Sequence, residues 1–269
     1  MRLKIEHITR HAYAEPLQHA VQHLCLTPPG GAHQTVLQWQ VRASGRLFAS
    51  TDGYGNLTHL CTLPPGARDS LVQAVGVVDT HGVPLLADDV PGAPPLSYLR
   101  PTPLVDSDEA LRRFARQVAG GRRCDEAALL ALAEAVAEQV AYQSGSTAVD
   151  TQAVQAFHAG RGVCQDQAHV YIAACRTLGW PARYVSGYFH ALGAEDLASH
   201  AWAEVCVDLD GRRWLSIDIT HRCPIDERHV RLAVGSDYSA CAPMRGVRSG
   251  GGAERMAVVL RVSELSTSA

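Results

Sequence analysis

The amino-acid sequence predicts an α+β protein in which a β sandwich comes first and a mixed part of helices and antiparallel strands follows. Three observations lead to this fold class. Short alternating runs of apolar and polar residues fill residues 1–98, helical periodicity dominates residues 106–178, and alternation returns over residues 182–219. A chain of 269 residues can form one large or two modest domains, and we place the division after residue 98.

The first 98 residues have the pattern of a small β sandwich. Strands are expected at residues 36–41, 56–63 and 71–78, and turn signals such as Asp52-Gly53 separate them. A linker is expected over residues 90–95, where Val-Pro-Gly-Ala-Pro-Pro interrupts any regular pattern. Residues 1–98 would therefore form an N-terminal β-rich domain and residues 99–269 a second domain.

Three helices are expected after the linker. The first covers residues 110–118 and stops at a Gly-Gly pair. The second starts at Asp125 and places apolar side chains on one face, which we interpret as a packing face. A third, short helix covers residues 151–158 and ends at Gly160, so that it leads directly into the most informative segment of the chain.

That segment, Gly162-Val163-Cys164-Gln165-Asp166-Gln167-Ala168, places a cysteine at the start of a fourth helix over residues 164–178. The N–H groups at a helix N-terminus lack partners, and the helix dipole favours negative charge there, so a thiolate is stabilised. Taken alone, the segment fits a catalytic nucleophile and a buried structural cysteine about equally well. Asp166 is interpreted as structural, because a carboxylate beside the thiol would oppose its ionisation.

A β hairpin after this helix supplies the other two groups of a thiol triad. Residues 199–208 and 212–219 alternate as strands and carry His200 and Asp218. A two-residue turn would put these side chains on opposite faces, because register parity decides the face. A three-residue loop with Gly211 in the left-handed conformation places Trp202 opposite Asp218 and His200 diagonally from it on the same face. The triad therefore requires an odd-length loop or a bulge.

Taken together, these motifs resemble the transglutaminase-like superfamily, in particular its bacterial branch with an N-terminal β domain. The similarity includes the cysteine segment, residues 179–188, Ser-His-Ala-Trp-Ala-Glu at 199–204 and the strand that bears Asp218. It extends to both ends of the chain, at residues 5–13, 24–28, 52–56, 233–238 and 245–252. The resemblance implies a transglutaminase-like core with the cysteine on a helix packed against an antiparallel sheet, by analogy with papain-like thiol enzymes.

The resemblance implies that Cys164 is the nucleophile, His200 the base and Asp218 the group that orients His200. Two positions depart from the family pattern. Gln167 stands where an aromatic residue is usual, and Ile219-Thr220-His221 stands in place of Pro-Thr-Asn. Neither change removes a triad member, but both lie close enough to alter the pocket.

An acyl-transfer site also needs donors for the oxyanion. The backbone N–H of Cys164 is the natural first donor. Tyr142, Gln152 and Trp202 are the candidates for the second donor or for the pocket wall. Trp202 fits two roles equally well, because it could exclude water from the site or cover the core beneath the hairpin.

Composition excludes several classes of protein. Hydrophobic residues make up 46% and charged residues 19%, as in an ordinary globular protein. A net charge of −3 gives no reason to expect nucleic acid as a partner. No leader pattern and no apolar run of about 18 residues occurs, so we expect a cytoplasmic protein without a membrane partner.

The eight cysteines are expected to be reduced, because the chain is large and shows no secretion signal. A metal site is not expected, since Cys-x-x-Cys is absent and the closely spaced histidines lie in strand-like stretches. No calcium-loop pattern is found either. We therefore expect no cofactor.

The sequence predicts thiol-dependent acyl transfer or hydrolysis at an amide or peptide carbonyl of glutamine type, through an acyl-enzyme intermediate. The partner would be a protein or peptide substrate that carries the amide. An amine acceptor gives transglutamination and water gives hydrolysis. Hydrolysis is slightly favoured, because a cytoplasmic cross-linker would endanger its host. The alternative is a non-catalytic binding or scaffold module, which a free strand edge or a large apolar patch on residues 1–98 would support.

Overall fold

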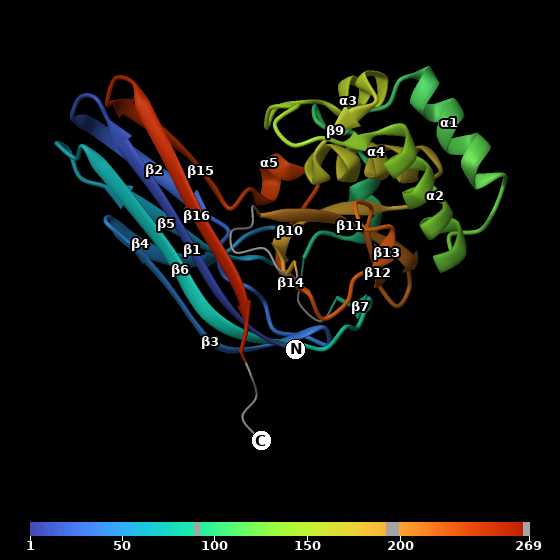
Figure 1. The fold of residues 1–269 in the computed structure, drawn as a ribbon, viewed down its shortest axis with the longest axis horizontal. Helices are drawn as coiled ribbons and strands as arrows, with labels where there is room; N and C mark the ends of the chain where they lie inside the picture. Colours follow the sequence, from blue (N-terminus) through green and yellow to red (C-terminus); the bar gives the residue numbers. More distant parts are fainter. Residues whose placement is uncertain (89–91, 192–198, 266–269) are drawn as a thin grey trace.

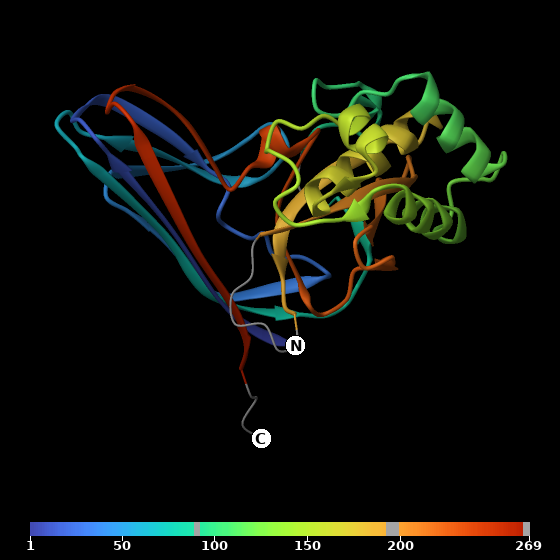
Figure 2. The same cartoon turned by 45° about the horizontal axis from the view of Figure 1, so that its top comes forward.

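The computed structural model describes residues 1–88, 92–191 and 199–265, so residues 90 and 91 of the expected linker lie outside the described residues. The fold is α+β, with a β sandwich beside a part in which helices cover an antiparallel sheet (Figures 1 and 2). The predicted fold class is therefore confirmed.

The sandwich consists of two four-stranded sheets, with strand orders β16-β1-β6-β3 and β15-β2-β5-β4. Its strands are β1 (Arg2–Tyr13), β2 (Leu17–Leu24), β3 (Gln34–Ala43), β4 (Arg46–Thr51), β5 (Leu57–Leu63), β6 (Asp69–Thr80), β15 (Met244–Gly250) and β16 (Glu254–Glu264). The three predicted strands correspond to β3, β5 and β6. Apolar side chains that alternate along the strands, among them Leu3, Ile5 and Val72, form the core between the sheets.

The two C-terminal strands complete the two N-terminal sheets. β16 pairs antiparallel with β1 from Leu3↔Glu264 to Tyr13↔Glu254, and β15 pairs with β2. The predicted division assigns residues 99–269 to the second domain, whereas in the structure residues 244–264 belong to the sandwich. The chain thus leaves the sandwich, forms the second part and returns.

In the second part, helices pack on one sheet. The sheet order is β13-β12-β11-β10-β14, with β7 also paired to β12. The strands are β7 (Leu85–Ala87), β10 (Ala182–Phe189), β11 (His200–Asp208), β12 (Arg213–Asp218), β13 (Cys223–Pro224) and β14 (His229–Gly235), and a short parallel pair is formed by β8 (Ala141–Tyr142) and β9 (Arg161–Gly162). The helices are η1 (Pro95–Leu99), α1 (Glu109–Ala119), α2 (Glu126–Gln139), α3 (Ala153–Ala159), α4 (Cys164–Thr177) and α5 (Tyr238–Cys241).

The predicted helices are present, and their ends coincide with the predicted capping residues. The Asp108 side chain accepts a hydrogen bond from the Leu111 N–H at the start of α1, and Asp125 does the same for Ala128 at the start of α2. Gly120 and Gly160 end α1 and α3 in the left-handed conformation. α4 is buried on nearly all sides between the other helices and the sheet, so its N-terminal residue is held rigidly. Among the described residues, no helix has the length and apolar character needed to cross a membrane.

Candidate active site

Cys164 is the first residue of α4, and two backbone contacts hold the segment before it. β9 pairs in parallel with β8, with Tyr142 opposite Gly162, and the Gln143 N–H donates to the Gly162 carbonyl at 2.7 Å. The Asp166 carboxylate accepts from the Val163 N–H at 2.7 Å and from the Thr147 hydroxyl at 2.6 Å. Asp166 thus caps the helix, in agreement with its interpretation as structural.

Glycine is required at position 162 for this contact. A Cβ there would lie 2.6 Å from the Asp166 Cβ and 2.8 Å from its Oδ2. We expect Gly162→Ala to displace the start of α4, to lower the free energy of unfolding by about 1–3 kcal/mol and to slow alkylation of Cys164 by about tenfold or more. Urea unfolding and the iodoacetamide rate measure both effects. Gly31→Ala is the matched control, because its Cβ would meet nothing within 4 Å. Unchanged Cys164 reactivity in Gly162→Ala would contradict this positioning role.

His200 lies between the thiol and a buried carboxylate. Its Nε2 is 2.7 Å from Asp218 Oδ2, so Nδ1 is the ring atom left for Cys164. Burial alone would lower the pKa of His200, but hydrogen bonds to Asp218 and Cys164 outweigh it and raise the pKa to about 10. The imidazole is therefore held in its charged form beside the thiol, as activation of a thiol nucleophile requires.

Asp218 is fully buried and accepts hydrogen bonds from more than one histidine. Its Oδ2 lies 2.7 Å from His221 Nδ1 and 2.9 Å from His229 Nε2, in addition to His200, and its Oδ1 accepts from the His221 backbone N–H at 3.1 Å. Although burial alone would raise the pKa of the Asp218 carboxyl, the bonds from the three histidines hold it far below its usual range. Asp218 is thus fixed as an anion that orients His200.

The hairpin has the register that the triad requires. Ala203 pairs with Ile217 and Cys206 with Trp214, and the same register carried on places Trp202 opposite Asp218. A bulge then shifts the pairing, so that Asp208 faces Arg213. The prediction that Gly211 adopts the left-handed conformation is wrong, because Arg212 adopts it instead, with φ 48°. The bulge lengthens the turn by one residue, which moves the left-handed position along the chain.

His229 is a site residue that the sequence did not reveal. It is fully buried at the start of β14, and its Nδ1 lies 3.0 Å from the Asp226 carboxylate, which fixes the ring. His221 stacks on Phe189, with ring centroids 4.2 Å apart. The departure at position 221 thus adds an imidazole to the Asp218 network. An isolated histidine gives no spacing signal, and only the pairing of β14 with β10 brings His229 to the site.

The four side chains His200, Asp218, His221 and His229 also have the atom types of a metal site, with one potential ligand atom each within 4.8 Å of one another. The sequence prediction, which rested on spacing, did not include this group. The hydrogen bonds to Asp218 Oδ2 already account for all three imidazoles. We therefore assign the cluster to the network that positions His200.

The three oxyanion or pocket candidates have different surroundings. Tyr142 lies beside the thiol, and burial together with the neighbouring Cys164 raises its pKa. Trp202 is completely buried under the site, with its ring centroid 6.1 Å from that of His200. Gln152 is the cap residue just before α3, its backbone N–H donates to the Gln155 side chain, and no described contact joins it to the triad. Tyr142 thus remains the candidate for an oxyanion donor.

Gln167, the other departure from the family pattern, ties the cysteine helix to the aspartate strand. Its side-chain amide donates to the Val140 carbonyl at 2.8 Å and its oxygen accepts from the Thr220 hydroxyl at 2.7 Å. Because Thr220 follows Asp218 by two residues, this bridge fixes the distance between the two halves of the triad.

Two family models match the chain. The transglutaminase-like superfamily core matches residues 112–219, which contain all three triad residues, and the bacterial transglutaminase-like N-terminal region matches residues 3–79. The chain belongs to the transglutaminase-like superfamily. The superfamily core thus coincides with α1 to β12, and the N-terminal region with the sandwich strands β1 to β6.

Similar proteins and a similar solved structure extend the comparison. An uncharacterized protein of Mycobacterium leprae is 29% identical over 98% of this chain and 99% of its own length. An uncharacterized protein of Mycobacterium tuberculosis is 28% identical over 91% of this chain and 87% of its own. A crystal structure from Cytophaga hutchinsonii, provisionally named a cysteine protease, covers 100% of this chain with a TM-score of 0.78 at 21% identity. That likeness shows that the whole fold, sandwich included, is shared.

Proposed function

We propose that this transglutaminase-like protein is a thiol enzyme that acts on an amide or peptide carbonyl of a protein or peptide substrate through an acyl-enzyme. The observation that carries the proposal is the placement of His200, which is buried, hydrogen-bonded to Asp218 and close enough to Cys164 for the thiol to affect its pKa. A thiol at a helix start, an imidazole and an orienting carboxylate are the parts that such catalysis needs.

The proposed chemistry has two halves. The Cys164 thiolate attacks the carbonyl carbon, the carbon–nitrogen bond breaks, and the His200 imidazolium gives its proton to the leaving amine. The thioester that remains is attacked by water or by an amine, from which His200 takes a proton, and the thiolate is released. The Cys164 backbone N–H, which lacks a helical acceptor at this first position, would donate to the oxyanion.

Hydrolysis and transfer use the same triad, and we favour hydrolysis on the biological ground given above. The alternative function is a non-catalytic binding or scaffold module. A free strand edge on the sandwich favours this alternative, but a binding surface alone gives no reason to bury a histidine between a cysteine and an aspartate. We therefore place the enzyme first.

The test is product formation on a protein substrate. Dimethylated casein is incubated with the protein, with and without monodansylcadaverine, and analysed by mass spectrometry for cleavage, deamidation and amine incorporation. We expect at least one of these products with the unaltered protein and none with Cys164→Ala. Cys124→Ala is the matched control and should retain activity, because Cys124 contacts the Cys206 carbonyl away from the triad. Product formed by Cys164→Ala at the original rate would refute the proposal.

A further inference from the structure

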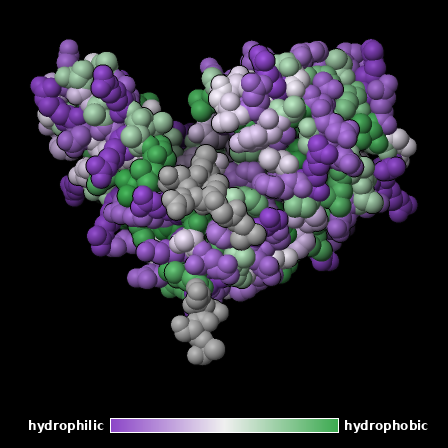
Figure 3. Space-filling view, viewed as in Figure 1, coloured by the Kyte–Doolittle hydropathy of each residue, from purple (hydrophilic) through white to green (hydrophobic). Residues whose placement is uncertain are grey.

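The sandwich contains an open groove next to the triad. β15 and β16 are consecutive in the chain, but they pair with β2 and β1 in different sheets. Between them lies a cavity of about 810 Å³ that opens to solvent, which we call the β15–β16 groove. Figure 3 shows the surface hollowed between the sandwich and the helix-bearing part, with apolar residues on the sandwich side.

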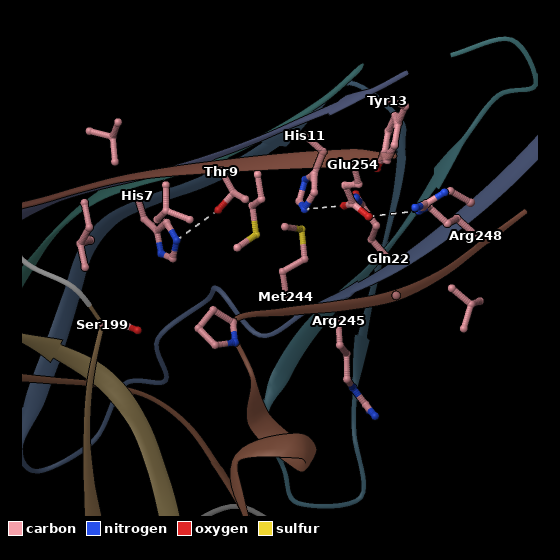
Figure 4. Close-up of a pocket in the computed structure, with 18 of the residues that line it drawn as sticks. His7, Thr9, His11, Tyr13, Gln22, Ser199, Met244, Arg245, Arg248 and Glu254 are labelled. Carbon is pink, nitrogen blue, oxygen red and sulfur yellow. Dashed lines mark hydrogen bonds and ion pairs between the residues drawn. The ribbon is translucent and has the colours of Figure 1, made fainter. Parts of the chain in front are cut away.

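The floor of the groove is polar where a sandwich interior is normally apolar. Along β1, the inward positions Leu3 and Ile5 belong to the core, whereas His7, Thr9 and His11 are buried side chains that line the groove (Figure 4). Both ring nitrogens of His7 already have partners, the Tyr188 and Thr9 hydroxyls, whereas His11 Nδ1 is buried without a hydrogen-bond partner among the described residues. A buried polar floor offers specific partners to a bound molecule.

The rim of the groove is a free strand edge. β16 is the terminal strand of its sheet, so the backbone groups on its other edge have no strand partner among the described residues. Met256 and Val258 are exposed on this strand. An extended peptide can add to such an edge, with main-chain hydrogen bonds that supply affinity and alternate side chains that enter the groove.

One end of the groove reaches the catalytic residues. Ser199, which directly precedes His200, lines the groove at the His7 end, and Glu254 and Arg248 lie at the other end (Figure 4). Tyr238 also lines it, and its ring contacts Tyr184, whose surroundings include Cys164. A chain bound in the groove would therefore continue toward the thiol.

The charge of the lining favours a segment that is neutral or acidic. Among the lining residues, Arg245, Arg248 and Arg261 outnumber the acidic Glu254, but Arg248 is paired with Glu254 and Arg261 with Glu6. Arg245, which donates to the His23 ring, therefore carries the positive charge that disfavours a basic segment and attracts an acidic one.

We propose that the β15–β16 groove binds an extended, neutral or acidic segment of the polypeptide substrate as an added strand on β16, and so presents the neighbouring amide to Cys164. The inference rests on the proposed function for the role of Cys164. It specifies the substrate class as unfolded or extended polypeptide instead of small amides.

Binding to an inactive protein tests the groove separately from the chemistry. Fluorescein-labelled β-casein, an unfolded acidic protein, is titrated with Cys164→Ala and followed by anisotropy. We expect that adding Met256→Glu and Val258→Glu weakens binding by about tenfold or more, through repulsion of an acidic segment from the strand that it pairs with. Phe48→Glu in the same background is the matched control and should leave the Kd within about twofold. Phe48 and Val258 are both 50% exposed on edge strands, but Phe48 lies on β4 in the other sheet.

Hydrogen exchange locates the contact. We expect bound casein to slow the exchange of amides in residues 254–260. The proposal is overturned by equal affinities of the groove and control variants, by protection confined to other strands, or by failure of casein to bind at about 100 μM protein. It is also overturned if the groove variant only dissociates a dimer of this chain, which would make the groove an interface between copies. Failure of the proposed function is seen separately, as an unreactive Cys164 in a protein that still binds casein.

Discussion

Asp218→Asn is expected to lower kcat/KM by about three to four orders of magnitude while Cys164 stays in place. Both carboxylate oxygens of Asp218 act as acceptors, because Oδ1 receives the His221 backbone N–H and Oδ2 receives the imidazoles. The amide group of asparagine must turn its NH2 toward one of these donors. The backbone N–H cannot change, so the NH2 faces the histidines. His200 then accepts at Nε2 and carries its proton on Nδ1, the atom that should take the proton of Cys164.

The alkylation rate of Cys164 separates this effect from a loss of folding, because it reports whether His200 still interacts with the thiol. Asp218→Asn should slow the alkylation of Cys164 at about pH 6, since an imidazole in the wrong tautomer no longer stabilises the thiolate. Asp226→Asn is the matched control, because Asp226 contacts His229 and not His200. Its kcat/KM should fall far less. Equal losses in the two variants would show that the carboxylates act on stability and not on the base.

Of the substitutions proposed for this protein, Glu204→Gln is expected to lower the free energy of unfolding most. Glu204 is completely buried on β11, where it accepts from Arg183 at 2.7 Å and from Arg231 at 2.8 Å. Burial alone would raise the pKa of Glu204, but the two guanidinium groups outweigh it and lower the pKa to about 2. Removal of the charge leaves two arginines without their shared partner, and we expect the free energy of unfolding to fall by about 3–5 kcal/mol. Urea unfolding at pH 7 measures this loss.

The loss should also depend on pH in a defined direction. The pKa of Glu204 is lower in the folded protein than in the unfolded chain, so its contribution is present above about pH 4.5 and disappears as the pH falls through about 2. The difference between the unaltered protein and Glu204→Gln should therefore shrink between these values. Glu109→Gln is the control, because Glu109 forms its ion pairs on an exposed helix surface. A Glu204→Gln protein as stable as the original at pH 7 would contradict the account of this network.

The local features of the site could be predicted from the sequence. Helix punctuation places Cys164 at the first residue of α4, and strand alternation puts His200 and Asp218 on one face provided that the loop between them has an odd length or a bulge. The turn between them could not be predicted in detail, because a bulge transfers the left-handed conformation from Gly211 to Arg212. A bulge depends on how the flanking strands pack, and the turn residues do not encode it.

The long-range features could not be predicted by periodicity. β16 pairs with β1 although more than 200 residues separate Tyr13 from Glu254, and no local pattern marks such a pairing. The same is true of His229, which reaches Asp218 only because β14 joins β10 at the edge of the sheet. The three candidate triad residues could thus be named from the sequence, whereas the histidine network around them and the groove beside them depend on tertiary structure.

The most direct test of the central claim is the rate of iodoacetamide alkylation at each cysteine against pH, with His200→Ala as the control. The other seven cysteines are internal references, since burial raises the pKa of each of them. An activated triad predicts that Cys164 alone reacts fast at about pH 6, and that His200→Ala removes this reactivity. If Cys164 reacts only above about pH 8.5, as a free thiol does, the triad is not catalytic and the binding-module alternative takes its place.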